Sequence, residues 1–386
     1  MRYAILLVPL IALFALACDD DGAEPSPTAT ESALAEPTPD AATTPEATAE
    51  TLAFLRDGDI WLIDADGGNE RRLNLSNAQS FSWISSDQLE VTTDEEPPRR
   101  LLVDLEGNSR ELLFPAGGSW SGDGTQYVVP VGQEVLVFAR DGEEVARLEV
   151  QPPPVGEGPK QIECGGTDPL VFGQPVFSPD GQSIFVAVEC SLLAGVTGNL
   201  AASVFEVSLD GTVNRRTPLS VNLDAGGGPR FSPDGSHMAQ LDTWDGGICV
   251  HPWYLTVADA NGDNGQELTL AELGAPHGGG VVGFDWSPDG DAVVATVNAA
   301  LCPDQGEGQV VAGLYILKLD GSQEEILAEE PAGAPAWSPA GKYIAYVSGE
   351  DFGEISEPPL IRLLDRTTGQ STDLATGGAP AWRPQP

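Results

Sequence analysis

Short runs of alternating apolar and polar residues follow one another along most of this chain, and turns that contain glycine separate them. Val, Ile, Leu and aromatic residues recur at every second position in these runs, whereas no long stretch has the 3.6-residue period of an amphipathic helix. From residue 51 to the C-terminus, the pattern therefore predicts an all-β protein made of many short strands.

A five-residue motif punctuates these runs and marks an internal repeat. FSPDG occurs at Phe177–Gly181 and again at Phe231–Gly235, and the variants WSPDG, WSPAG and WSGDG occur elsewhere. Alignment on the leading aromatic residue gives seven anchors at intervals of 37, 57, 54, 55, 51 and 45 residues. The anchors are Trp83, Trp120, Phe177, Phe231, Trp286, Trp337 and Trp382. Because they repeat with the sheets, we expect them to pack one sheet against the next.

Each repeat contains four short strands joined by tight turns. In the last full copy, APAWSP is followed by KYIAYVS, LIRLLDRTTG and QSTDLA. Asp-Gly suits the first turn of most copies, since glycine tolerates a positive φ and the preceding proline needs no ladder donor. A four-stranded sheet whose edges are covered only by its neighbours is the blade of a β-propeller. We therefore predict a seven-bladed β-propeller of four-stranded antiparallel blades over residues 51–386.

The two ends of the repeat region predict how the ring closes. The last copy, APAWRPQP, stops after one strand, while the repeat region begins at TLAFLRDG with what the other copies place second. We expect the C-terminal strand to complete the N-terminal blade, which removes a free sheet edge. Trp382 should then pack on the sheet that holds Trp61.

The repeat resembles a known family. WSPDG followed by a strand, then a strand that ends in DADGGN (Asp64–Asn69) with Arg72-Leu73 after it, is similar to the TolB-type, WD40-like propeller repeat of bacterial envelope proteins. The resemblance extends over nearly everything after residue 51. It implies an envelope protein that binds partners through a propeller and has no built-in reaction.

Length variation among the repeats indicates which face of the ring meets partners. The first and third turns of a blade share one face and are short, whereas the second turns and the connections between blades lie on the other face and vary in length. We expect the binding surface on this variable face. Its candidate loops are Thr93–Pro98, Cys190–Ala201, Thr243–Pro252, Asn298–Gln309 and Ser348–Pro359, with the connection Pro152–Gln174.

The N-terminus resembles a bacterial lipoprotein signal peptide. Residues 1–17 contain a charged start, an apolar run from Ala4 to Ala17 that is too short to span a membrane, and small residues before Cys18. Ala15 stands where that family most often has Leu. The resemblance implies cleavage before Cys18 and lipidation of its side chain, although an ordinary secretory signal cut near Ala17 would also export the protein.

Residues 18–50 are predicted to be a disordered tether. This Pro-, Ala- and Thr-rich segment has nine acidic residues and no Lys or Arg, so it lacks the apolar surface to fold. Of 59 acidic and 18 basic residues, 50 and 17 then remain in the propeller, a net charge of −33. A surface of that sign repels phosphates, so we expect no nucleic-acid partner and membrane contact through the lipid anchor only.

Four cysteines follow Cys18. They are Cys164, Cys190, Cys249 and Cys302, and in the predicted topology all fall toward the variable face. An even number in an exported chain favours disulfides, with three possible connectivities. We favour Cys164–Cys190 and Cys249–Cys302. A metal site is the alternative, but no Cys-x-x-Cys pair supports it.

No catalytic motif stands out. The chain lacks the G-x-S-x-G elbow of α/β-hydrolases, and His251 and His277 lack the spacing of metal ligands, so we predict neither a catalytic residue nor a metal or other cofactor. Together with these two histidines, Trp244, Trp253 and Phe352 stand in or beside the variable loops and do not follow the repeat. Aromatic residues at such places are favoured binding anchors.

Two functions fit this sequence. The first is a monomeric, non-catalytic lipoprotein of the cell envelope, anchored to a membrane on the periplasmic or outer side, whose propeller face binds a protein, a peptide or a glycan. The second is a propeller enzyme, such as a hydrolase, lyase or cyclase, with a metal in the central channel. The scarcity of histidine and the lack of a nucleophile–base pair favour the first.

Overall fold

A computed structural model describes residues 50–150, 170–190, 202–221, 228–243, 253–268, 279–299, 313–328, 332–348 and 359–385. These residues belong to the compact unit Thr48–Pro386 and form 29 β-strands. Within these ranges there is no helix long and apolar enough to cross a membrane. The all-β prediction is confirmed.

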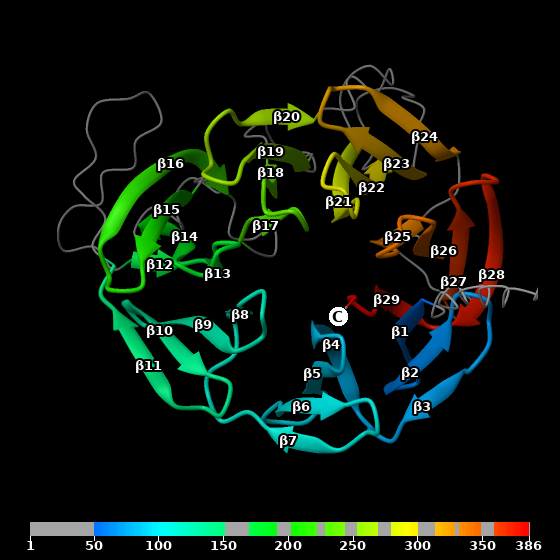
Figure 1. The fold of residues 1–386 in the computed structure, drawn as a ribbon, viewed down its shortest axis with the longest axis horizontal. Coiled ribbons are helices and arrows are strands. Elements are labelled where there is room, and N and C mark those ends of the chain that lie inside the picture. Colours follow the sequence, from blue (N-terminus) through cyan, green and yellow to red (C-terminus); the bar gives the residue numbers. More distant parts are fainter. Residues whose placement is uncertain are drawn as a thin grey trace, which may run out of the picture. The chain divides into compact units, whose positions relative to one another are not determined.

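The strands form seven antiparallel sheets arranged around a ring (Figure 1), here called blades 1 to 7. From the inner strand outward, blade 1 contains β29 (Gly378–Trp382), β1 (Thr51–Arg56), β2 (Asp59–Asp64) and β3 (Arg71–Leu73). Blade 2 contains β4 (Ala78–Ser85), β5 (Gln88–Thr93), β6 (Arg100–Asp104) and β7 (Ser109–Glu111). Blade 3 contains β8 (Ser119–Trp120), β9 (Gln126–Val131), β10 (Glu134–Ala139) and β11 (Glu144–Leu148).

The other four blades repeat this order. Blade 4 contains β12 (Leu170–Phe172), β13 (Val176–Phe177), β14 (Ser183–Cys190), β15 (Ala202–Ser208) and β16 (Val213–Val221). Blade 5 contains β17 (Arg230–Phe231), β18 (His237–Thr243), β19 (Trp253–Asp259) and β20 (Gln266–Leu268). Blade 6 contains β21 (Gly279–Trp286), β22 (Ala292–Ala299), β23 (Gly313–Lys318) and β24 (Gln323–Ala328). Blade 7 contains β25 (Ala332–Trp337), β26 (Tyr343–Ser348), β27 (Leu360–Asp365) and β28 (Gln370–Thr376).

The ring closes as the sequence predicts. The last strand, β29, pairs antiparallel with the first, β1, and places Trp382 opposite Leu52. The amide of Arg383 also donates a hydrogen bond to the carbonyl of Thr51 at 2.9 Å. The C-terminal strand therefore completes the sheet that contains Trp61, and backbone hydrogen bonds hold the two ends of the ring together.

Blade 4 departs from the prediction in one respect. Residues Leu170–Phe172, expected to be part of a connection between blades, form β12 and pair with Val188–Cys190. Two short strands, β12 and β13, thus share the inner edge of β14. Gly173-Gln174-Pro175 separates them, and Pro175 cannot donate a ladder hydrogen bond, which explains why one strand becomes two.

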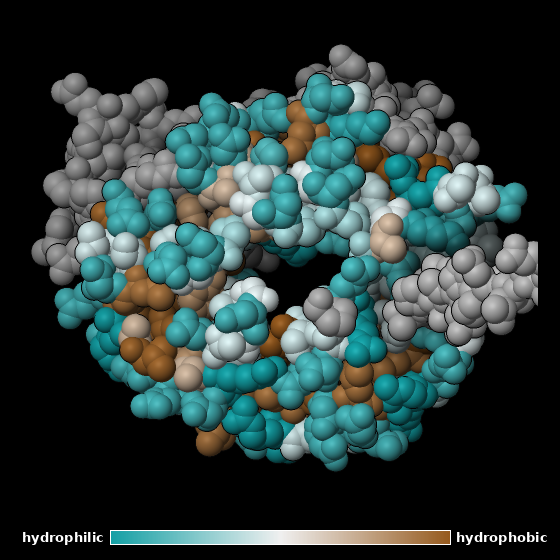
Figure 2. All heavy atoms as spheres, viewed as in Figure 1, coloured by the Kyte–Doolittle hydropathy of each residue, from teal (hydrophilic) through white to brown (hydrophobic). Residues whose placement is uncertain are grey.

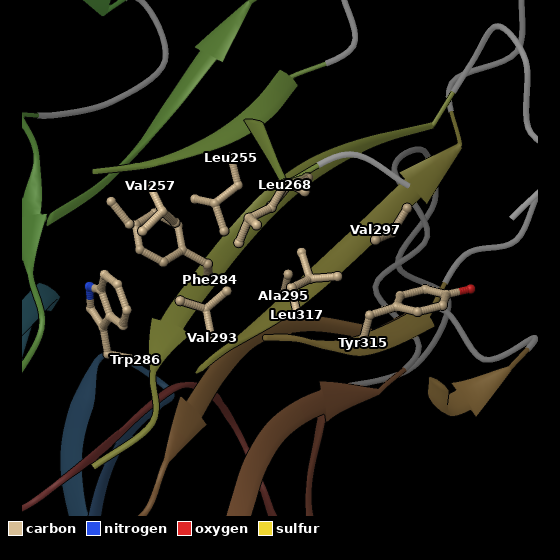
Figure 3. Close-up of a cluster of buried hydrophobic side chains, with 12 residues drawn as sticks. Leu255, Val257, Leu268, Phe284, Trp286, Val293, Ala295, Val297, Tyr315 and Leu317 are labelled. Carbon is tan, nitrogen blue, oxygen red and sulfur yellow. The ribbon is translucent and has the colours of Figure 1, made fainter. Parts of the chain in front are cut away.

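The core is divided among the spaces between blades. The described residues contain seven clusters of buried apolar side chains, and each cluster joins two neighbouring blades. Between blades 5 and 6, for example, Phe284 and Trp286 of β21 lie against Val257 of β19 (Figure 3). In blade 1, Leu52 packs toward blade 7 and Ala53 toward blade 2. Both faces of a blade are buried, so middle strands such as β10, β23 and β26 are almost continuously apolar.

The repeated serine of the SPDG turn has a role that its sequence pattern does not reveal. The hydroxyl of Ser232 donates to Oδ1 of Asp234 at 2.6 Å and accepts the amide of His237 at 3.0 Å. Gly235 has a φ of 71° and donates its amide to the carbonyl of Ser232. Hydrogen bonds from the hydroxyls of Ser232 and Ser236 lower the pKa of Asp234 to about 2. The motif is therefore a self-contained turn, whose buried serines are Ser121, Ser178, Ser232, Ser287 and Ser338.

Three anchor indoles join neighbouring blades by hydrogen bonds as well as by packing. Their Nε1 groups donate to carbonyls on the inner strand of the preceding blade: Trp83 to Ala381 at 3.1 Å, Trp286 to Arg230 at 3.1 Å, and Trp382 to Ala336 at 3.0 Å. These anchors therefore fix the spacing of successive inner strands.

Replacement of Trp382 by alanine tests the closure. Trp382 is 7% exposed and fills the cluster between blades 7 and 1, so its loss should lower the free energy of unfolding by about 3 to 5 kcal/mol. Urea unfolding measures the change. As a control, Leu113→Ala should change it by no more than about 0.5 kcal/mol, since Leu113 is 87% exposed. Equal losses in both variants would contradict the closure described here.

Candidate functional site

A cavity of about 680 Å³ lies where the inner strands of blades 2 and 3 meet. Its walls come from β4, β5, β6, β8 and β9, together with Gln174 beside β13 and Pro384 just after β29. Because β4, β8, β13 and β29 are the inner strands of four consecutive blades, the cavity faces the middle of the ring (Figure 1). A space-filling view along the ring axis shows an opening there (Figure 2).

The cavity exists because the face of blade 2 that meets blade 3 is polar near the ring axis, although Leu102 and Phe114 pack against blade 3 on the same face. In β5, Leu89 and Val91 pack toward blade 1, so the alternate residues Glu90 and Thr92 point to the cavity side. In β4, Ser80 and Ser82 line the cavity in the same way. Small and polar side chains thus replace, near the ring axis, the apolar packing that fills the other spaces between blades.

The opposite wall of the cavity contains Gly118, at a position where no larger residue fits. The inner strand of blade 3, β8, has only two residues, and the Ala116-Gly117-Gly118 segment before it borders the cavity. A Cβ atom at Gly118 would lie 1.8 Å from the carbonyl oxygen of Val128, so only glycine fits. The amide of Gly118 donates to the hydroxyl of Tyr127 at 2.8 Å, and its carbonyl accepts Nε2 of Gln174 at 2.7 Å.

A buried ion pair forms the polar base of the cavity. Nε of Arg100 lies 2.6 Å from Oε1 of Glu90, and their side chains are 6% and 14% exposed. The indole Nε1 of Trp120 donates to the other carboxylate oxygen of Glu90 at 2.6 Å. Nη1 of Arg100 donates to the carbonyls of Phe114 at 3.1 Å and Pro115 at 2.7 Å. Both oxygens of Glu90 are therefore engaged inside the protein.

Aromatic rings surround the guanidinium. Its central carbon lies 4.4 Å from the ring centroid of Tyr127 and 5.1 Å from that of Phe114, within the range of cation–π attraction. The ring of Trp120 meets Tyr127 edge-on at 5.2 Å. Burial raises the pKa of Tyr127, so its hydroxyl stays protonated. These contacts pack the guanidinium against the two rings at the base of the cavity.

The ionisable groups of the cavity are engaged within the protein. The ionisable lining residues are Glu90, Arg100 and Tyr127, and each is held by contacts within the protein. No histidine lines the cavity, and the carboxylate beside the lining residue Ser121, that of Asp123, accepts the hydroxyls of Ser121 and Thr125, which lower its pKa and make it a weak base. Among the described residues, no group of three His, Cys, Asp or Glu side chains is placed to hold a metal ion.

A second buried carboxylate, Asp285 on β21, lies elsewhere on the ring. Desolvation raises its pKa to about 6, against the opposing effects of the amide of Trp337, the charge of Arg230 and the amide of Trp286. Oδ2 of Asp285 accepts the amide of Trp337 at 2.7 Å. Since Trp337 belongs to the next blade, this contact joins the inner strands of blades 6 and 7.

Most residues that the sequence singles out as site candidates lie outside the described ranges. They are Cys18, Cys164, Trp244, Cys249, His251, His277, Cys302 and Phe352. Cys190 ends β14 and Trp253 begins β19, so both lie at the end of their blade that carries the second turn, as expected. The two disulfides and the loop anchors remain predictions.

None of the cavity residues is among the site residues predicted from the sequence. The strand sequences of blade 2 nevertheless differ from those of the other blades in a way that indicates a polar site. The second strand of blade 2, QLEVTT, alternates apolar and polar residues, whereas its equivalents SIFVAVEC, AVVATVNA and YIAYVS are largely apolar. Ser82 and Ser119 also precede the anchors Trp83 and Trp120. The two anchors line the cavity besides packing between blades.

Solved structures share the fold at low sequence identity. An oligogalacturonate lyase from Vibrio parahaemolyticus is 13% identical with a TM-score of 0.54, over 86% of this chain and 87% of that chain. The β-propeller domain of the Trilobed protease from Pyrococcus furiosus is 14% identical with a TM-score of 0.52, over 83% of this chain and 90% of that chain.

A TolB from Agrobacterium tumefaciens is 21% identical with a TM-score of 0.38, over 70% of this chain and 86% of that chain. No protein-family model and no curated protein matches the sequence. These similarities concern the fold, and one fold serves many functions.

The ion pair can be tested through stability. Glu90→Gln leaves the charge of Arg100 buried and uncompensated, so the free energy of unfolding should fall by about 3 to 5 kcal/mol. Adding Arg100→Met should restore part of this loss in urea unfolding. Glu134→Gln is the matched control: its partner Arg147 is 49% exposed, so the expected loss is below about 1 kcal/mol. Similar losses at the two sites would show that the Glu90–Arg100 pair is not buried.

Asp285 predicts a pH effect. A raised pKa means that the folded state holds a proton more tightly than the unfolded state, so stability falls as pH rises from about 4 to about 6. In Asp285→Asn, which keeps an acceptor for Trp337, this loss disappears. The variant should match the wild type near pH 4 and exceed it at pH 7.5 by up to about 3 kcal/mol in urea unfolding. A pH-independent difference between the two proteins would refute this assignment.

Proposed function

We propose that this protein is a non-catalytic lipoprotein of the bacterial cell envelope, whose propeller binds a protein, peptide or glycan in the cavity between blades 2 and 3. The observation that carries the proposal is the composition of this cavity: aromatic rings and hydroxyls line it, and its charged groups are already paired. Pockets of several hundred Å³ with apolar walls and a few placed polar groups are typical of ligand sites.

The paired charges favour recognition over chemistry. Glu90 accepts hydrogen bonds from both Arg100 and Trp120, and Asp123 accepts the hydroxyls of Ser121 and Thr125, so neither carboxylate is a free base. Trp120 is only partly buried and lines the cavity, so its ring presents apolar surface to a ligand. Aromatic side chains of this kind contribute much of the energy at binding sites.

The envelope location rests on the N-terminal sequence. A signal-like segment before Cys18 and an acidic tether to residue 50 fit a lipid-anchored protein held away from a membrane. The propeller would then stand as a monomer at the periplasmic or outer side. We propose that the variable loops, with Trp244, His251, Trp253, His277 and Phe352, add contacts around the partner.

A cavity-filling variant tests this function. Ser82 is exposed and lines the cavity, so Ser82→Phe should block the cavity while leaving the core intact. Full-length protein in detergent is immobilised, and detergent-solubilised bacterial envelope is passed over it. Quantitative mass spectrometry of bound proteins and glycans should show at least a tenfold loss for Ser82→Phe.

The matched control is Ser109→Phe, since Ser109 is exposed on the outer strand of the same blade. This variant should bind as the wild type does. Equal capture by all three proteins would place the binding site elsewhere. A stoichiometric metal, together with turnover of an envelope polymer that is lost when the metal is removed, would replace the proposal by the enzyme alternative.

A further inference from the structure

One donor group at the base of the cavity has no acceptor. A guanidinium carries five N–H groups, and in Arg100 the Nε–H bonds to Glu90 while Nη1 bonds to two backbone carbonyls. Nη2 is buried and makes no hydrogen bond with any described residue. Buried donors are nearly always satisfied in folded proteins, so an acceptor from outside the chain, either a water or a ligand atom, is expected here.

The net charge of the site determines whether that acceptor can be an anion. Glu90 already neutralises Arg100, and the propeller around them carries a net charge of −33. A second anion would have to be buried with no cation left to compensate it, which is costly. The missing acceptor is therefore a neutral oxygen, such as a hydroxyl, an ether or a carbonyl.

The walls narrow the choice further. The indole N–H group of Trp120 is used within the protein, so this side chain offers only ring surface, whereas the ring of Trp83 packs against the cluster between blades 1 and 2. Ser80 and Ser82, both exposed, add hydroxyls to the same cavity. Ring surface next to hydroxyls matches a molecule with apolar C–H faces and a rim of hydroxyl groups.

We propose that the cavity binds a neutral saccharide segment, which stacks on the ring of Trp120 and accepts a hydrogen bond from Nη2 of Arg100. This inference rests on the proposed binding function and names its ligand class. Since Nη2 is buried before binding, the guanidinium turns toward the cavity as the sugar enters. Its stacking on Tyr127 makes the near-ultraviolet absorbance of that tyrosine a reporter of the movement.

Direct titration tests the ligand class. Full-length protein is titrated by calorimetry with cellotetraose, maltotetraose and tetra-N-acetylchitotetraose, and with tri-galacturonate and a neutral Gly-Ser peptide as competitors of different chemistry. At least one neutral tetrasaccharide should bind, quench tryptophan fluorescence and shift the tyrosine absorbance. Neither the acidic saccharide nor the peptide should bind as tightly.

Variants separate the roles of the wall residues. Arg100→Lys keeps the charge but loses the forked donor, so affinity should fall at least tenfold and the tyrosine shift should vanish. Thr92→Val removes a hydroxyl from the cavity wall with little change of side-chain volume. This variant should therefore fold like the wild type and bind the saccharide several-fold more weakly. Ser82→Phe should abolish binding, and Ser109→Phe should leave it unchanged.

The outcomes distinguish this inference from the function on which it rests. If no neutral saccharide binds while Ser82→Phe still loses envelope material, the ligand class is wrong and the binding function stands. Tighter binding of tri-galacturonate or of the peptide would also overturn the saccharide assignment. If neither titration nor capture depends on the cavity, both proposals fall.

Discussion

Every blade of this ring must bury two faces, and that requirement governs the rest of the structure. Each sheet is one layer thick, so its alternate side chains pack against the preceding and the following blade. Seven clusters between neighbouring blades take the place of one central core. A ring satisfies this requirement only when it closes, because an open end would leave one face of a blade uncovered.

Hydrogen bonds near the axis keep the blades in register. Three anchor indoles reach carbonyls of the preceding inner strand, and Asp285 accepts an amide from the following one. The buried serines of the SPDG turns satisfy an amide within five of the blades instead. Some polar groups therefore connect neighbouring blades. Others, including the serines of the repeated motif, satisfy hydrogen bonds within a single blade.

The candidate site lies where the packing rule is relaxed. Blade 2 turns Ser80, Ser82, Glu90 and Thr92 toward blade 3, and the short β8 leaves room opposite them. A buried ion pair with aromatic rings then stabilises a space that apolar side chains fill elsewhere. The fold supplies a rigid frame, and the function resides in this local departure from the repeat.

The sequence alone determined the all-β class, seven blades and the closure through Trp382, because alternation, turn residues and anchors are local signals that recur in every copy. It did not reveal the split strand of blade 4 or the cavity. The residues of the cavity come from five strands between Ser80 and Tyr127, with Gln174 and Pro384 from two more blades. Only the tertiary structure decided that they meet, because their contact depends on which face of blade 2 is turned toward blade 3.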